Sequence, residues 1–143
     1  MPSKLDDPIV VINKFPPNIK DIEKVFDLTN KRPIFAWGGI IFNPYNAVID
    51  EPLRIHELTH FAQQQGKPKE WWDKYLVDKK FRLEQEIEAY SNQYNSYRKL
   101  TKDRNFLARY LFRLASDLSS SMYGNIITVS EATKRIKDFK YSE

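Results

Sequence analysis

The sequence of 143 residues predicts an α+β fold that is mostly helical and has a small β-sheet near the N-terminus. Most of the short β-branched and apolar runs lie in residues 9–49, and long stripes of apolar residues at helical spacing follow them. The aromatic content of 14% indicates a folded chain with many ring contacts in its core. The length fits a single domain, residues 1–143, and no repeat or linker interrupts it.

The first two elements are predicted to be a strand and a helix. Residues 9–13 favour a strand because most of them are β-branched. Asn18 is a typical N-cap, and a helix is expected to run from there to about Leu28. The side chains predicted to face the core from this helix are Ile19, Ile22, Val25 and Phe26.

A β-hairpin is predicted for residues 34–43. Two short apolar runs flank Gly38-Gly39 there, and glycine readily adopts the positive φ angles of a two-residue hairpin turn. Val48-Ile49 are expected to add a short strand. The next helix is predicted to open at Asp50-Glu51-Pro52, because proline fits the first turn and acids complement the helix dipole, and to end before Gly66.

Four more helices are predicted along the rest of the chain. They cover residues 70–77, 81–100, 103–118 and 130–139. Ser130 is the expected cap of the last one, and before it residues 123–125 are expected to turn and residues 126–129 to be extended. The core-facing side chains predicted for the two long helices are Ile87, Tyr90, Tyr94, Tyr97, Leu100, Phe106, Leu107, Tyr110, Leu111, Leu114 and Leu118.

Both histidines of the chain lie in one stretch, His56-Glu57-Leu58-Thr59-His60, which is the HExxH pattern of zinc-dependent hydrolases. Residues four apart share a helix face, so both imidazoles can bind one ion. Glu57 lies beside them and is placed to take a proton from a water on that ion. With two histidines in the chain, this arrangement arises by chance about once in a thousand sequences. It therefore favours a metal site over two solvated histidines on a surface helix.

The other side chains of this helix divide between two faces. Gln63 and Gln64 project near the histidines, and they are expected either to line a cleft or to be exposed to solvent. The side chains predicted to face the core are Ile55, Leu58, Thr59 and Ala62.

Two histidines leave a catalytic zinc site one protein ligand short, because zinc hydrolases generally use three. The chain has no third histidine and no cysteine, so the third ligand is expected to be a carboxylate. Glu86 is preferred, since it falls about 40° from Tyr90 on the wheel of the helix predicted at residues 81–100. Glu84 is the reserve candidate, and Glu88 is expected to be solvated.

The stretch His56-Glu57-Leu58-Thr59-His60-Phe61-Ala62-Gln63-Gln64, followed by Glu86-Ile87-Glu88-Ala89-Tyr90, resembles the gluzincin metallopeptidases, in particular short single-domain ones of bacteria and phages. The resemblance covers roughly residues 34–97. It implies a minimal zincin-like domain that binds zinc through His56, His60 and Glu86. It also implies that Tyr90 hydrogen-bonds a ligand histidine, and that the hairpin lies above the motif helix and pairs with an extended peptide.

These observations together predict a zinc metallopeptidase that hydrolyses a peptide or protein substrate. Glu57 is expected to act as the general base, and Tyr123 beside Gly124 is a candidate donor to the oxyanion. The alternative is a non-enzymatic protein that keeps zinc for structure or binds a partner, for example in a phage assembly. Glu57 argues against this alternative, because a purely structural site does not need a base.

The charges of the chain are unevenly spread. Residues 1–60 hold seven basic and eight acidic side chains, whereas residues 61–143 hold sixteen and eleven. The densest basic stretch lies between Arg98 and Arg113, where a solvated helix face is expected rather than a nucleic-acid interface. Met1–Pro8 lacks the apolar core of a signal peptide, and no apolar run has membrane-spanning length. A cytoplasmic protein is therefore expected, or one packaged in a phage particle.

Overall fold

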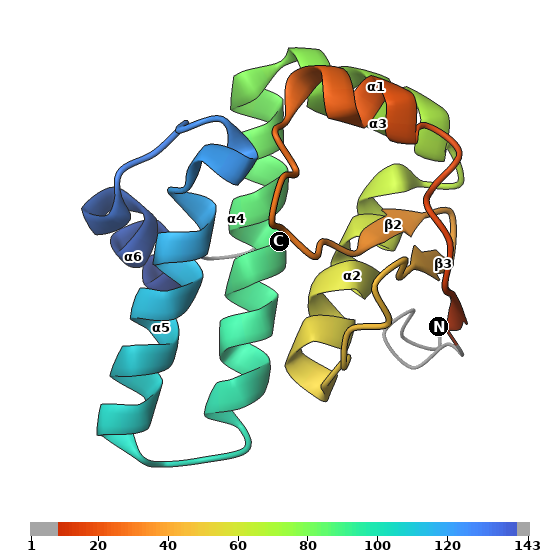
Figure 1. Cartoon of the computed structure of the whole chain (residues 1–143). Helices are drawn as coiled ribbons and strands as arrows, with labels where there is room; N and C mark the ends of the chain where they lie inside the picture. Colours follow the sequence, from red (N-terminus) through yellow and green to blue (C-terminus); the bar gives the residue numbers. More distant parts are fainter. Residues whose placement is uncertain (1–8, 140–143) are drawn as a thin grey trace.

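The computed structural model describes residues 9–139, which form an α+β fold of six α-helices and a three-stranded sheet (Figure 1). This confirms the predicted fold class. Residues 1–8, where no signal peptide is expected, lie outside the described residues, as do residues 140–143. In chain order the elements are β1 (Val10–Ile12), α1 (Ile19–Val25), β2 (Phe35–Trp37), β3 (Ile40–Phe42), α2 (Glu51–Gln64), α3 (Pro68–Val77), α4 (Lys79–Arg98), α5 (Arg104–Leu118), the 3-10 helix η2 (Ser121–Tyr123) and α6 (Val129–Asp138).

The predicted hairpin forms strands β2 and β3. These strands are antiparallel, with Trp37 opposite Ile40, and φ angles of 53° at Gly38 and 92° at Gly39 make the turn between them. β1 pairs with β3 in parallel, so the strand order is β1-β3-β2. β2 is therefore an edge strand, and it packs on α2.

The strand predicted at Val48-Ile49 is wrong. The Asn43 side chain accepts a hydrogen bond from the Ala47 N–H and donates one to the Ala47 carbonyl, both at 2.9 Å. This side chain closes a turn and uses backbone groups that a strand pair would need. Val48 is left 90% exposed.

Helix α1 is shorter than predicted and ends at Val25. Phe26 turns to an extended backbone, with φ −118° and ψ 137°, and its ring is buried, whereas Val25 is 44% exposed against the prediction. Asn18 stands at the N-cap position, but its side chain makes no capping hydrogen bond. Its ψ angle of 21° differs from the extended backbone that usually accompanies such a cap.

The C-terminal part differs from the prediction in three details. Helix α4 ends before Leu100, which is 64% exposed rather than part of the core. Residues 126–128 are irregular rather than a strand. Thr128, not Ser130, caps α6, because its hydroxyl accepts a hydrogen bond from the Glu131 N–H at 3.2 Å. The last helix therefore begins earlier than expected.

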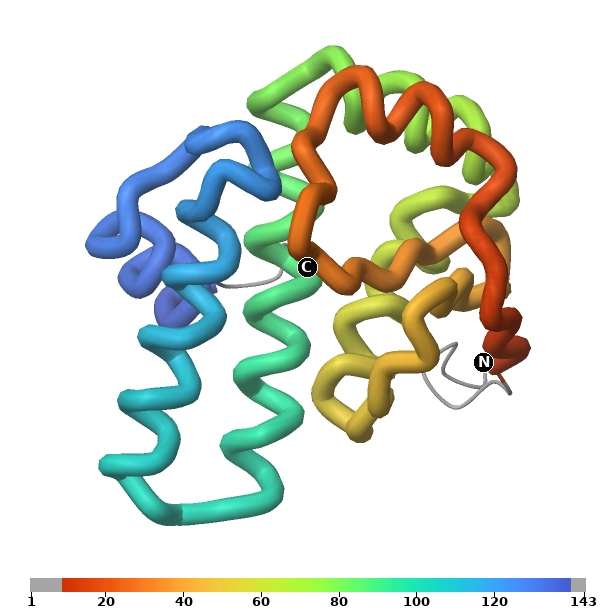
Figure 2. Tube along the Cα trace, viewed as in Figure 1, coloured from red at the N-terminus to blue at the C-terminus, as the bar shows by residue number. Residues whose placement is uncertain are grey.

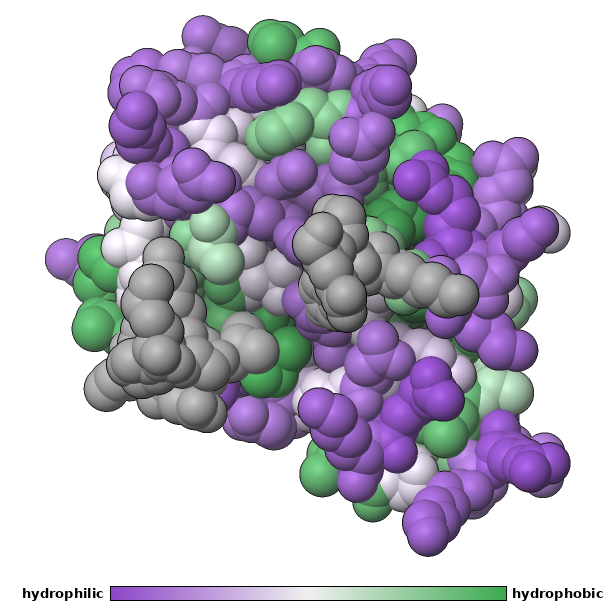
Figure 3. Space-filling model, turned by 180° about the vertical axis from the view of Figure 1, so that it is seen from behind, coloured by the Kyte–Doolittle hydropathy of each residue, from purple (hydrophilic) through white to green (hydrophobic). Residues whose placement is uncertain are grey.

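Helix α4 is the central element of the fold, with α5 and α6 on one side and α2 on the other (Figures 1 and 2). One apolar cluster joins α4 to α5 and α6 around Leu118 and Ile136. A second joins α1, the hairpin and α3 around Ile22 and Trp72. On the face seen in Figure 3, hydrophobic residues form small areas separated by hydrophilic ones. Helix α2 packs on α4, and His56 and His60 of α2 contact Tyr90 of the first cluster and Trp71 of the second.

Arg82 on α4 is buried and ties three segments together. Its guanidinium donates to the backbone carbonyls of Tyr75 and Leu76 at 2.9 Å each and of Tyr123 at 3.0 Å. Gly124 permits this contact, since a Cβ there would lie 3.1 Å from Nη1 of Arg82. The end of α3 and the helix η2 are thereby fastened to α4.

Replacing Arg82 by methionine is expected to destabilise the fold by at least about 3 kcal/mol, because three buried carbonyls lose their donors. Lysine should restore only part of the loss, since an ammonium does not reproduce the planar fork of donors. Urea unfolding measures both variants. The matched control is Arg109→Met on the exposed face of α5, where a change below about 0.5 kcal/mol is expected. A loss for Arg82→Met as small as that of the control would contradict the proposed role.

Candidate metal centre

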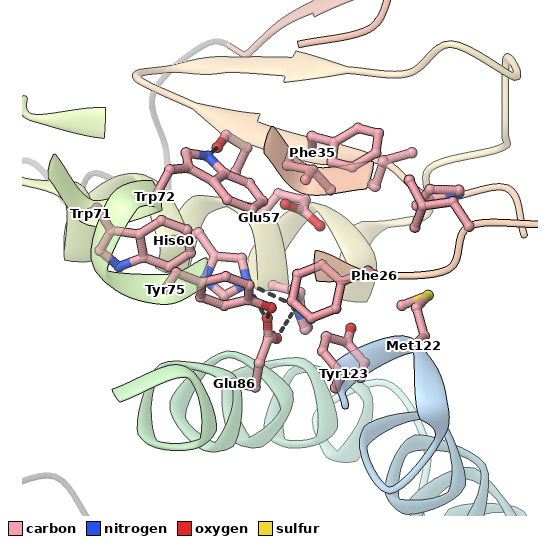
Figure 4. Close-up of a pocket in the computed structure, with 16 residues that line it drawn as sticks. Phe26, Phe35, Glu57, His60, Trp71, Trp72, Tyr75, Glu86, Met122 and Tyr123 are labelled. Carbon is pink, nitrogen blue, oxygen red and sulfur yellow. Dashed lines mark hydrogen bonds and ion pairs between the residues drawn. The ribbon is translucent and has the colours of Figure 1, made fainter. Parts of the chain in front are cut away.

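Three buried side chains from two helices meet at one point. α2 supplies His56 and His60, one turn apart, and α4 supplies Glu86; Figure 4 shows His60 and Glu86 pointing toward each other. The Nε2 atoms of the two histidines are 3.2 Å apart, and Glu86 Oε1 lies 3.2 Å from His56 Nε2 and 3.3 Å from His60 Nε2. These side chains therefore lie close enough to bind one metal ion.

The hydrogen bonds of Gln63 determine which nitrogen of His60 faces the centre. The Gln63 amide nitrogen donates to the Gln85 carbonyl at 2.9 Å and to the Glu88 carboxylate at 2.8 Å, and both of these groups only accept. The Gln63 oxygen is therefore the atom that lies 2.8 Å from His60 Nδ1, so Nδ1 carries the proton. His60 Nε2 thus directs its lone pair at the centre.

Gln93 on α4 holds His56 in the same way. Its amide oxygen lies 2.9 Å from His56 Nδ1, and its amide nitrogen donates to the Tyr110 hydroxyl at 3.0 Å. His56 Nδ1 then donates to the amide oxygen, which leaves the Nε2 lone pair free. For both histidines an amide oxygen takes the place that a carboxylate, carbonyl or water commonly has behind a metal ligand.

The two oxygens of Glu86 have different surroundings. Oε2 accepts a hydrogen bond of 2.6 Å from the Tyr75 hydroxyl. Oε1 is buried and has no hydrogen-bond donor within residues 9–139. When both histidines are neutral, two imidazole lone pairs and a carboxylate oxygen therefore converge with no proton donor among them. Such an arrangement is stable only when positive charge lies between the three atoms.

The pKa values of these groups also indicate that positive charge is stabilised between them. Burial lowers the pKa of His60, but the neighbouring Glu86 carboxylate outweighs it and raises this pKa to about 9. Burial raises the pKa of Glu86, but His60 and His56 outweigh it and bring this pKa far below its usual range. A proton or a metal ion is thus stabilised at this point.

Glu57 lies beside the centre on α2. Its side chain is 5% exposed and faces the cavity near Phe35 (Figure 4). Burial raises the pKa of Glu57, an effect that His56 and His60 offset in part when they are charged. A raised pKa brings this carboxylate closer to the range that suits a general base at neutral pH.

Tyr90 and Tyr123 are both near the centre. The Tyr90 ring meets the His56 ring edge-on, with centroids 4.5 Å apart, and its hydroxyl lies 2.7 Å from the Tyr123 hydroxyl. The hydrogen bond expected from Tyr90 to a ligand histidine is not formed. The physical reason is that Gln93 and Gln63 already occupy the Nδ1 atoms of the two histidines.

Four of the sequence-predicted side chains have surroundings that were not expected. Glu84 is exposed, whereas Glu88 is half-buried and accepts from Gln63, so the exposure expected for these two acids is reversed. Gln63 neither lines a cleft nor faces solvent, since both ends of its amide are used inside the protein. Ala62 is exposed rather than part of the core, because it lies near the end of α2 on the side away from α4.

Gln64 fixes the hairpin to the motif helix. Its amide accepts from the Gly38 N–H at 2.7 Å and donates to the Ala36 carbonyl at 2.8 Å. The Ala36 carbonyl points away from β3 and also accepts from Trp72 Nε1 at 2.9 Å. The free edge of β2 is therefore occupied at Ala36. Ile34 precedes the first residue of β2. An extension of the strand by one residue would direct its backbone groups to the same edge as those of Ala36, because alternate residues of a strand face the same edge.

Two cavities meet at the metal centre. One has a volume of about 70 Å³ and is lined mainly by apolar and aromatic side chains, among them Phe26, Phe35 and Trp72. The other, termed the α5 cleft, has a volume of about 430 Å³ and extends between residues 31–34 and helix α5. The side chains that border both cavities include His56, Glu57 and Tyr123.

Sequence reasoning missed the residues that hold the ligands in place. Gln93 was detectable, because it lies seven residues after Glu86 and therefore on the same face of α4. Gln63 was predicted to lie on the histidine face, but its hydrogen bond to His60 was not predicted. Tyr75 lies on the helix predicted at residues 70–77, and no local spacing connects it with Glu86 on another helix.

Replacing Tyr75 by phenylalanine is expected to weaken metal binding by about 10–100-fold, because Glu86 loses the hydrogen bond that orients its carboxylate. The ring stacking of Tyr75 on Trp71, with centroids 4.8 Å apart, is retained in the variant. Competition with a chromophoric chelator measures the affinity. The control is Tyr94→Phe, a buried tyrosine of α4 outside the centre, for which no change is expected. Equal affinities of the two variants would contradict the role of the Tyr75 hydroxyl.

No family model, curated protein or solved structure matches this chain. Within residues 9–139, no helix is both long and apolar enough to cross a membrane. The functional proposal below therefore rests on the geometry of the centre and on the sequence motif.

Proposed function

We propose that this protein is a zinc-dependent metallopeptidase of the gluzincin type with a minimal zincin-like fold. The observation that carries the proposal is the convergence of His56 Nε2, His60 Nε2 and Glu86 Oε1 within 3.3 Å of one another, where Oε1 has no hydrogen-bond partner within residues 9–139. Glu57 lies buried beside this point as a candidate base, and the α5 cleft leads to it from the surface.

The distances between the three atoms suit zinc. Tetrahedral zinc with bonds of about 2.0–2.1 Å keeps its ligand atoms about 3.3–3.4 Å apart. The corresponding separations in this chain are 3.2, 3.2 and 3.3 Å. Two histidines and one carboxylate leave a fourth position for water, whereas structural zinc sites are closed by four protein ligands that usually include cysteine. The ligand set therefore supports a catalytic rather than a structural site.

In the proposed reaction, His56, His60 and Glu86 would hold zinc, which would supply an activated water and polarise the carbonyl of the peptide bond. Glu57 would take the proton of the attacking water and pass it to the leaving nitrogen, since its carboxylate lies buried beside the two histidines. Gln63, Gln93 and Tyr75 keep the three ligand side chains in a fixed orientation.

Two further groups have proposed roles toward the substrate. When the Tyr90 hydroxyl donates to the Tyr123 oxygen, the Tyr123 proton is free for the oxyanion that develops on the substrate. The outward backbone groups of Ile34 are proposed to pair with the peptide, since the edge at Ala36 is occupied and Ile34 borders both cavities.

Metal analysis combined with a peptide-library cleavage assay tests this proposal. We expect one zinc ion per chain, loss of cleavage on chelation, and recovery on addition of one equivalent of zinc. Stoichiometric zinc without cleavage of any library member would instead favour the non-enzymatic alternative, a structural or partner-binding protein. Cleavage that persists in the chelated protein would contradict the proposed mechanism.

A further inference from the structure

The α5 cleft carries charged side chains that the proposed hydrolysis does not use. They lie around the path from the metal centre to the surface, on the segment before β2, at the start of α2 and on α5. Its basic residues are Lys31, Arg32 and Arg113, and its acids other than Glu57 are Asp50 and Asp117.

The basic side chains of the cleft outnumber its acids other than Glu57 by three to two. Asp50 is engaged as the cap of α2, where it accepts from the Leu53 N–H at 3.0 Å. Within residues 9–139, no ion pair shorter than 4.0 Å involves Lys31, Arg32 or Arg113. Three cations therefore border the cleft together with two acids. Asp50 caps α2, and Asp117 lies one turn after Arg113 on α5, where burial raises its pKa and Arg113 and Lys31 offset part of that effect.

A peptide bound at the metal centre has to pass these cations. The second cavity at the centre is small, about 70 Å³, and mainly apolar. The α5 cleft, about 430 Å³, is the larger space that continues from His56 and Glu57. One side of a bound peptide therefore extends along the cleft, between Lys31 and Arg32 on one wall and Arg113 on the other.

We propose that the α5 cleft selects peptides that carry a carboxylate on the side of the scissile bond lying in the cleft. The carboxylate belongs either to an acidic side chain or to the C-terminus of the peptide. The proposal rests on the proposed function, because the cleft leads to the same centre. The proposal gives a role to only part of the basic stretch between Arg98 and Arg113. Arg113 borders the cleft, whereas Arg109 does not.

Binding to the zinc-loaded Glu57→Gln variant, whose cleavage is expected to be strongly slowed, tests the proposal by fluorescence anisotropy. The probes are matched peptides with Glu, Gln or Lys at each position, each with a free or an amidated C-terminus. A carboxylate is expected to improve affinity about fivefold over its neutral counterpart, and Lys to weaken it, with differences that shrink at high salt. If the preference remains after the C-terminus is amidated, the recognised carboxylate belongs to a side chain. If amidation removes the preference, the recognised carboxylate is that of the C-terminus.

Arg113→Gln in the same background is expected to remove most of this preference, whereas Arg109→Gln, an exposed arginine one turn away on α5, should leave it unchanged. The ratio of kcat/KM values for the wild-type protein on the same peptides gives a second measurement. A carboxylate preference without any cleavage by the wild type supports the cleft and overturns the hydrolysis. Three results would overturn the inference. The Glu, Gln and Lys peptides would bind equally, the two arginine variants would have equal effects, or the protein would neither bind nor cleave any of the peptides.

Discussion

Replacing Glu57 by glutamine is expected to lower peptide cleavage by about 10²–10⁴-fold, the usual contribution of a general base, while zinc stays bound. Glutamine has the size of glutamate but cannot take a proton from the attacking water. The metal ligands are His56, His60 and Glu86 in our proposal, so the zinc content should remain one per chain. Steady-state cleavage and metal analysis of the same preparation measure both quantities.

The control for this variant is Glu51→Gln on the same helix. Glu51 is exposed in the first turn of α2, where it pairs with Arg54 at 3.2 Å, away from the centre. This substitution should leave both cleavage and zinc content unchanged. A Glu57→Gln variant that cleaves as fast as the control would show that another group acts as the base. Loss of zinc together with activity would mean that Glu57 supports the metal rather than the proton transfer.

The spacing of residues along single helices predicted the core of the site. The HExxH pattern put His56 and His60 on one face, and the wheel of α4 favoured Glu86 over Glu84 and Glu88. In the structure Glu86 is buried next to both histidines. This reasoning works because the helical period alone decides the direction in which these side chains point.

Contacts between distant segments were not predictable in this way. Arg82 is buried because carbonyls from the end of α3 and from η2 surround it, and its own helix gives no sign of them. Tyr75 reaches Glu86 from another helix, so no period relates the two. The parallel pairing of β1 with β3 likewise joins strands that are separated by α1 and β2. Thr128 rather than Ser130 caps α6. Serine and threonine are both common N-caps, so residue type alone could not distinguish the two positions.

Replacing Glu86 by glutamine is expected to weaken zinc binding by more than about 100-fold, beyond the loss typical of residues that only support a ligand. The variant removes the charged oxygen that lies 3.2 and 3.3 Å from the two histidine nitrogens. Competition with a chromophoric chelator measures the affinity, and circular dichroism checks that the helices are retained. Unchanged zinc affinity would contradict ligation by Glu86.

Glu84→Gln and Glu88→Gln are the matched comparison, because each removes one negative charge from the same helix. Glu84 is exposed, so its variant should bind zinc as the wild type does. Glu88 accepts from the Gln63 amide at 2.8 Å, and its loss should loosen His60 and weaken binding by about tenfold. A general effect of charge on α4 would instead lower the affinity similarly in all three variants. Direct ligation by Glu86, with support from Glu88 through Gln63, instead predicts three different zinc affinities. The affinity should be highest for Glu84→Gln, lower for Glu88→Gln and lowest for Glu86→Gln.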